Sequence, residues 1–223
     1  MVLMRKSGRM TASVGYSHHD HLCWVYRGEQ SWWAAVRSFL VEGAARRDRL
    51  VIVTDAPEEA PEHIARMPSA SRLLDRRQLL VVGLETWHDA LGAQPPWQAT
   101  LRTWAGEALA AGLRGVRVAA DATPLVLADT FGQPQATELA LDRLVCDLPL
   151  TVMCGYDGEH LAPDAGVGLC FAHPLWHGAK GEVAANLFAE QHGQWRLSGS
   201  LDLMTRTELG CALAAVRAGS GDV

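Results

Sequence analysis

Histidine and cysteine side chains alternate over a short segment near the start of the chain. His19, His21 and Cys23 are separated by single residues, so on an extended strand all three would point to one face. Imidazole and thiolate groups together suit zinc, copper or iron, so the alternation allows a metal or haem site at these residues. In the alternative interpretation, His21 and Cys23 are inward-facing strand residues and His19 lies in the solvated segment before the strand.

Further polar side chains stand at the ends of expected strands, where open α/β sheets bind their ligands. Tyr26 ends one apolar segment, Asp121 and Thr123 follow another, and Cys154 and Tyr156 end a third. Asp121 and Thr123 could equally cap a turn or helix. The predicted ligand-binding residues are His21, Cys23, Tyr26, Asp121, Thr123, Cys154, Tyr156 and His173.

The loop after the first apolar segment lacks the chemistry of a nucleotide-binding loop. A phosphate-binding P-loop needs several glycines and a lysine, whereas residues 26–31 contain Gly28 alone and no lysine. Glu29 in the same loop would repel phosphate. The sequence also contains no dinucleotide fingerprint and no nucleophile elbow, so we predict binding without catalytic turnover.

Short apolar segments alternate with segments of helical periodicity along most of the chain. Continuous apolar segments indicate strands buried on both faces, as in parallel sheets. We therefore predict an α/β fold with a mainly parallel sheet and helices on both faces. The predicted strands are residues 21–26, 50–55, 78–84, 115–121 and 150–156, and the main helices are residues 29–45, 97–111 and 135–147.

The two ends of the chain differ from this pattern. Residues 1–17 are rich in Arg, Lys, Ser, Gly and Thr and predict a mobile arm before a domain at residues 18–180. Residues 181–223 predict two strands joined by a turn at residues 191–193, then a helix at residues 203–216. This tail is too short for its own core, so we expect it to pack on the domain or on a second copy of the chain.

The composition limits the class of protein further. The chain has 223 residues, of which 48% are hydrophobic, which is enough for one sizeable core. Its net charge of −5 argues against non-specific nucleic-acid binding. The apolar runs are too short to span a bilayer and no secretory signal is evident, so we expect a cytoplasmic protein with reduced cysteines.

An ordered set of segments resembles the MEDS family, the methanogen/methylotroph sensory domains of a dichloromethane-responsive regulator. The resemblance covers residues 18 to about 178. It implies a relative of RecA/KaiC-type ATPases that has lost its P-loop, and a sensory domain for small molecules such as hydrocarbon derivatives. The segments that carry it are residues 21–26, 39–43, 50–53, 120–125, 154–157 and 172–175.

The tail is similar to part of a STAS domain, the fold of anti-sigma-factor antagonists. Residues 193–202 resemble its first strands and residues 209–216 the helix that follows. The sequence ends before the strand and loop where such domains carry their phosphorylated serine, so the resemblance does not predict the usual phosphoswitch. The tail could be a functional STAS remnant or a dimerisation element.

We therefore expect a small-molecule sensor that transmits its ligand state through the tail or through a partner protein of the kinase or anti-sigma type. We also expect a homodimer without direct nucleic-acid contact. The alternatives are a metal- or haem-binding protein and a ligand-free interaction module.

Overall fold

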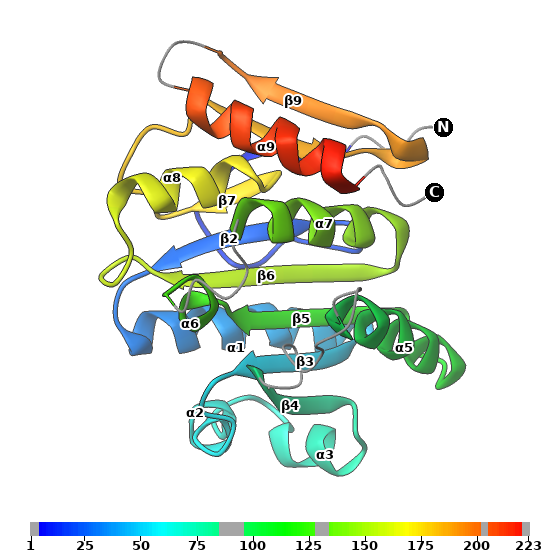
Figure 1. Ribbon diagram of the computed structural model, residues 1–223. Coiled ribbons are helices and arrows are strands. Elements are labelled where there is room, and N and C mark those ends of the chain that lie inside the picture. The colour runs from blue at the N-terminus through cyan, green and yellow to red at the C-terminus, as the bar shows by residue number, and fades with distance from the viewer. Residues whose placement is uncertain (1–4, 85–95, 128–133, 202–204, 220–223) are drawn as a thin grey trace.

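A seven-stranded sheet forms the centre of the computed structural model, which describes residues 5–84, 96–127, 134–201 and 205–219 (Figure 1). The strand order is β1-β7-β2-β6-β5-β3-β4, and the paired strands run parallel throughout. This arrangement confirms the predicted α/β fold. The strands are β1 (Gly8–Arg9), β2 (His21–Tyr26), β3 (Arg49–Thr54), β4 (Leu79–Gly83), β5 (Val116–Asp121), β6 (Leu150–Asp157) and β7 (Leu175–His177).

The continuous apolar character of the central strands follows from burial on both sheet faces. Along β3, Leu50 and Ile52 pack on one face, whereas Val51 and Val53 pack on the other. All four side chains are at most 1% exposed. Since neighbouring strand residues point to opposite faces, a strand covered twice needs apolar residues at every position.

Helices cover both faces of the sheet, as predicted. One face packs against α5 (Pro96–Ala110), α7 (Pro134–Asp147) and α8 (Pro163–Phe171), and α6 (Thr123–Leu127) lies at its carboxyl edge. The other packs against α1 (Glu29–Arg46), α2 (Ala60–Ile64) and α3 (Ala70–Asp75). None of the helices in the described ranges combines the length and apolar character needed to cross a membrane.

The N-terminal segment differs from the mobile arm that its composition predicts. From residue 5 onward it packs on the domain, with β1 paired to β7 and Met10 buried in the core. Arg5 forms a buried ion pair with Asp142, which lies 137 residues further along the chain. Because this partner is distant in sequence, no local pattern predicts that the N-terminal segment is held on the domain. Residues 1–4 of the predicted arm lie outside the described residues.

The tail forms the predicted strand-strand-helix unit. β8 (Ala185–Ala189) pairs antiparallel with β9 (Trp195–Gly199) across the turn η1 (Gln191–Gly193), and α9 (Arg206–Gly219) follows. The unit packs on α7 and α8 through an apolar cluster instead of forming a separate core. The buried members of that cluster are Leu139, Phe171, Ala172, Ala185, Leu187 and Ala212. Residues 202–204 and 220–223 lie outside the described residues.

Candidate functional site

The predicted ligand-binding residues divide between the two faces of the sheet. On β2, Cys23 packs on the face covered by α7 and α8, whereas Tyr26 packs on the face covered by α1. Strand alternation places His21 with Cys23. The structure thus forms two groups of polar residues where the sequence predicts one pocket. The first group contains His21, Cys23, Cys154, Tyr156 and His173, and the second contains Tyr26, Asp121 and Thr123.

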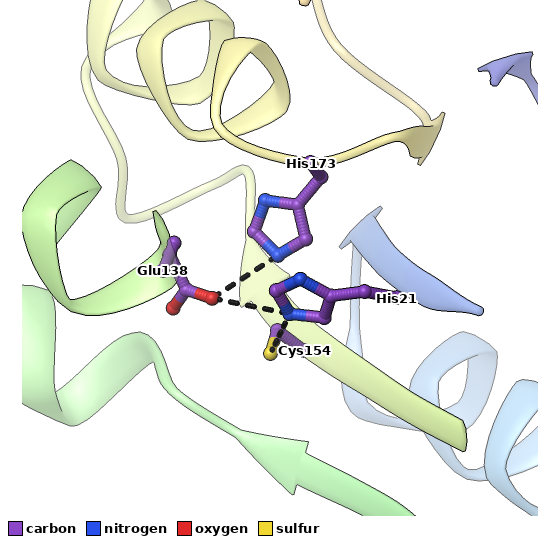
Figure 2. A group of neighbouring side chains, drawn as sticks. All are labelled: His21, Glu138, Cys154 and His173. Carbon is purple, nitrogen blue, oxygen red and sulfur yellow. Dashed lines mark hydrogen bonds and ion pairs between the residues drawn. The ribbon is translucent and has the colours of Figure 1, made fainter. Parts of the chain in front are cut away.

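Three side chains of the first group and one from helix α7 converge in the interior (Figure 2). We name these four side chains the His/Cys/Glu cluster. The cluster consists of His21, Glu138, Cys154 and His173, all buried, with one potential ligand atom from each within 4.8 Å of the others. His21 Nε2 lies 3.4 Å from Cys154 Sγ and 3.4 Å from a Glu138 oxygen. His173 Nε2 lies 3.1 Å from the same oxygen, Oε2.

Strand register and one buried amide hold three members of the cluster in place. Cys23 stands opposite Cys154 in the β2–β6 pair, so His21 and Cys154 are diagonal neighbours on one face. His173 lies in the turn between α8 and β7, where the buried Asn186 side chain donates hydrogen bonds to the carbonyls of His173 and Pro174 at 2.9 and 2.8 Å.

Each side of the cluster is held by a further partner. His21 Nδ1 lies 3.2 Å from Asp142 Oδ1, and His173 Nδ1 lies 2.8 Å from the Leu169 carbonyl. Arg5 donates to both Asp142 oxygens at 2.7 and 2.8 Å. The buried Tyr156 hydroxyl donates to Glu138 Oε1. The cluster is therefore oriented from outside by a second layer of hydrogen bonds.

The buried charges in and around the cluster compensate one another. Burial alone would raise the pKa of Asp142, but Arg5 and His21 outweigh it and lower this pKa to about 2. The two imidazoles likewise hold the pKa of Glu138 well below its usual range, against the effect of burial. Burial lowers the pKa of His173, whereas the hydrogen bond to Asp142 and the nearby Glu138 carboxylate outweigh burial and raise the pKa of His21. At neutral pH both carboxylates are therefore ionised, and His21 holds a second proton more readily than His173 does.

An apolar pocket adjoins the cluster at the carboxyl ends of β3 and β5. Its cavity volume, counted for water-sized molecules, is about 30 Å³, so the pocket is narrow. Glu138 and Cys154 belong both to its lining and to the cluster. The other lining residues are Val53, Leu84, Trp97, Ala120, Ala122, Leu125, Val126, Pro134, Thr137 and Leu141. Apolar walls with a few convergent polar groups are typical of small-molecule sites.

The second group of predicted residues lies in an acidic pocket at the same edge of the sheet. Tyr26 donates to Asp121 Oδ2 at 2.8 Å, and the Thr123 hydroxyl donates to Asp121 Oδ1 at 2.7 Å. Burial raises the pKa of both Asp121 and Tyr26. The pocket begins where the loop after β2 enters α1, and its carboxylates disfavour phosphate. Those carboxylates are Glu29, Asp55, Glu59, Asp121 and Asp157.

The alternating His19, His21 and Cys23 do not share a ligand site in the structure. His19 has a φ of 74° and precedes β2, so the alternation breaks before it, and its Nδ1 lies 3.1 Å from the Val145 carbonyl. Cys23 points to the His21 face, but its Sγ contacts Cys170 Sγ at 3.5 Å.

Sequence reasoning missed Glu138, Asp142 and Arg5. Glu138 and Asp142 are four residues apart on the buried face of α7, and both are almost inaccessible to solvent. Two carboxylates on the apolar face of a predicted helix are a usable signal, because such groups are rarely buried without partners. For Arg5 we find no corresponding signal.

Comparison with known protein families gives one match, and comparison with curated proteins gives none. The matching family model is MEDS, the methanogen/methylotroph, DcmR sensory domain, over residues 20–174. The matched range begins just before His21 and ends just after His173, and it contains all four cluster residues. The match covers most of the chain, which therefore belongs to the MEDS family of sensory domains.

Proposed function

We propose that the chain senses a small, mostly apolar molecule, which it binds in the apolar pocket without turnover. The observation that carries this proposal is the composition of the pocket, whose hydrocarbon walls meet a polar floor at Glu138 and Cys154. Each Å² of apolar ligand surface removed from water there contributes about 25 cal/mol. The floor groups would orient a ligand that carries one polar or halogen atom, as a hydrocarbon derivative does.

The apolar pocket fits this function better than the acidic pocket does. Asp121 and Asp157 belong to the acidic pocket, and Tyr26 and Thr123 already satisfy the Asp121 oxygens. An uncharged ligand would have to displace water from these carboxylates without offering them an equivalent partner. Of the predicted ligand-binding residues, we therefore assign Cys154 to the ligand site and His21, Tyr156 and His173 to its support.

Helix α7 contacts both the apolar pocket and the tail, so a change in its position could couple ligand binding to the tail. Thr137 and Leu141 line the pocket, whereas Leu139 packs in the cluster formed with the tail. In addition, Asp142 accepts a hydrogen bond of 2.6 Å from the backbone amide of Ala189, the last residue of β8. A ligand that favours one position of α7 would shift how the tail docks, provided that its affinity differs between the two positions.

The tail is the proposed surface for a regulatory partner or a second copy of the chain. Leu197, Leu201 and Leu213 are between 39% and 50% exposed there. Exposed leucines on a strand pair and its helix fit both the proposed dimerisation element and the proposed STAS-like docking to a kinase or anti-sigma type protein. Sedimentation of the wild-type chain and of Leu213→Ser tests the dimer, which the substitution should weaken.

Thermal-shift and tryptophan-fluorescence titrations with short-chain haloalkanes and alcohols test the ligand site. Trp97 lines the pocket, so its emission should respond to an occupant. Thr137→Leu adds bulk to the pocket and should abolish the response. Ala136→Leu is the matched control, since this neighbour is also half-buried on α7 but is not part of the pocket lining. No response in the wild type, or equal responses in both variants, would contradict the proposal that the apolar pocket binds the ligand.

A further inference from the structure

We propose that the His/Cys/Glu cluster binds one zinc ion through His21 Nε2, His173 Nε2, Cys154 Sγ and Glu138 Oε2. The four atoms come from β2, the turn after α8, β6 and α7, so the ion would join elements that are distant in sequence. This proposal rests on the geometry of the cluster and not on the proposed function. The two sites share Glu138 and Cys154, so with zinc bound these residues would form the pocket floor as ligands of the ion.

The strongest argument is a pair of buried polar atoms that face each other at short distance without a hydrogen bond of acceptable geometry. The Leu169 carbonyl can only accept, so His173 Nδ1 must be the donor in their 2.8 Å hydrogen bond. In neutral His173 the Nε2 lone pair then faces Glu138 Oε2, another acceptor, at 3.1 Å. Within the described part of the chain, neither of these two atoms has a hydrogen-bond partner of acceptable geometry.

A proton on His173 Nε2 would allow a hydrogen bond to Glu138, whereas a divalent ion would bind both atoms directly. A divalent ion satisfies the lone pair and the carboxylate together without protonating the imidazole.

Three of the six separations between the ligand atoms are close to those around a four-coordinate zinc ion. Bonds of about 2.0–2.1 Å to nitrogen or oxygen and about 2.3 Å to sulfur place tetrahedral ligands roughly 3.3–3.6 Å apart. The three separations are 3.1 Å for His173 to Glu138, 3.4 Å for His21 to Glu138, and 3.4 Å for His21 to Cys154. The other three are at most 4.8 Å, so small side-chain movements would close the cluster around an ion.

The outer hydrogen bonds are those that metal-binding side chains use. A metal-ligating histidine commonly donates its second ring N–H to a carboxylate or a backbone carbonyl. His21 has Asp142 in that position, and His173 has the Leu169 carbonyl. Tyr156 donates to the Glu138 oxygen that is left over. These contacts leave one ring nitrogen of each histidine and one carboxylate oxygen facing the centre of the cluster.

Charge balance and ligand type favour zinc. A thiolate and a carboxylate together neutralise a divalent ion, which lowers the cost of burying it. Without metal, burial keeps the pKa of the Cys154 thiol well above its usual value. Zinc binding would release the thiol proton to solvent, and His21 would bind through an unprotonated Nε2. A mixed set of imidazole, thiolate and carboxylate around four positions is typical of zinc.

The test is metal analysis of the full chain, purified without chelators or a metal-affinity column. We expect one zinc ion per chain by elemental mass spectrometry. After replacement by Co²⁺, the protein should show the visible bands of a four-coordinate ion and a near-ultraviolet thiolate-to-cobalt band. Cys154→Ser should lose the thiolate band, whereas Cys170→Ser should keep it. Cys170 is the matched control, because its thiol is equally buried in the same core but is not a member of the cluster.

The metal content and Co²⁺ spectrum of the wild-type protein test the proposal even if Cys154→Ser fails to fold. Wild-type protein without zinc and without a Co²⁺ spectrum after metal addition would overturn the proposal, as would bound metal without a thiolate band. Loss of the band in Cys170→Ser with retention in Cys154→Ser would also overturn it. Thr137→Leu should keep its zinc, so failure of the apolar-ligand proposal and failure of the zinc proposal are distinguishable.

Discussion

The two polar groups, which lie on opposite faces of the sheet, stabilise their charges in different ways. Around the His/Cys/Glu cluster, the carboxylates of Glu138 and Asp142 are balanced by imidazoles and a guanidinium, and the pKa of each carboxyl is lowered. In the acidic pocket, Asp121 is held by the hydroxyls of Tyr26 and Thr123, and burial raises its pKa. The first arrangement stabilises negative charge and can accept a cation, whereas the second resists further negative charge.

The same strands build both groups, so the comparison can be made with matched substitutions. β2 supplies His21 to the cluster and Tyr26 to the acidic pocket. β5 supplies Ala120 to the wall of the apolar pocket and Asp121 to the acidic one. Each side also contains an aspartate and a tyrosine–carboxylate hydrogen bond, but Asp142 is fully buried whereas Asp121 is only partly buried.

The largest difference should come from replacing each aspartate by asparagine. Asp142→Asn removes the partner of Arg5, whose side chain is 3% exposed, and leaves its charge buried. Breaking a buried ion pair in this way costs about 3–5 kcal/mol of unfolding free energy. Asp121→Asn keeps the acceptor for Thr123 and places an NH2 group beside the Tyr26 hydroxyl, which can turn to accept from it. Because the substitution also removes a charge that burial disfavours, it should cost far less than Asp142→Asn at neutral pH. Urea unfolding of both variants measures these changes.

Arg46→Met is the control for loss of an exposed charge pair. Arg46 pairs with Glu42 along α1 with a side chain that is 43% exposed, so this variant should lose less than about 1 kcal/mol. If Asp121→Asn were as destabilising as Asp142→Asn, the proposed contrast between the two sides would be wrong.

Acid should remove a stabilising contribution on the cluster side. The folded pKa of Asp142 is about 2, below its usual 3.8, so the ionised form favours folding. This contribution is complete above pH 3.8, declines as the pH falls towards 2, and amounts to about 2 kcal/mol. The sign is opposite for Asp121, whose raised pKa means that ionisation disfavours folding as the pH rises.

Urea unfolding across this acid range, in wild type and Asp142→Asn, separates the contribution of Asp142 from general acid denaturation. The variant should lose less stability than the wild type as the pH falls. If the unfolding free energies of the two proteins fell equally with pH, the ion pair of Asp142 would contribute nothing to the stability of the folded state.

The central strands were predictable because burial on both faces requires a continuous apolar segment, which is visible in the local sequence. The apolar segment at residues 21–26 coincides with β2, and the other four predicted strands match β3 to β6 to within one or two residues. β1 and β7 contain two and three residues, too few to show periodicity, and form by pairing with each other and with β2. Their positions depend on tertiary contacts that no local pattern contains.

The site was predictable in part, for a related reason. Strand alternation predicts that His21 and Cys23 share a face, but not that Cys154 becomes the diagonal neighbour of His21, because this depends on strand order and register. Glu138 joins from a helix more than one hundred residues away. The alternation also wrongly extends to His19, whose positive φ lies outside the strand.

The smallest difference should come from the two tyrosine hydroxyls. Tyr156→Phe removes the donor to Glu138 Oε1, both partners being buried, and a lost hydrogen bond to a buried charge costs about 1.5–3 kcal/mol. Tyr26→Phe removes a donor to Asp121, but this carboxyl keeps Thr123 and borders a pocket that water can enter, so about 0.5–1.5 kcal/mol is expected. Chemical unfolding in the presence of a chelator compares the two losses without a metal contribution. An equal or larger loss in Tyr26→Phe would mean that hydroxyl donors hold the acidic pocket as firmly as ionic partners hold the cluster, and the distinction between the two sides would then rest on charge alone.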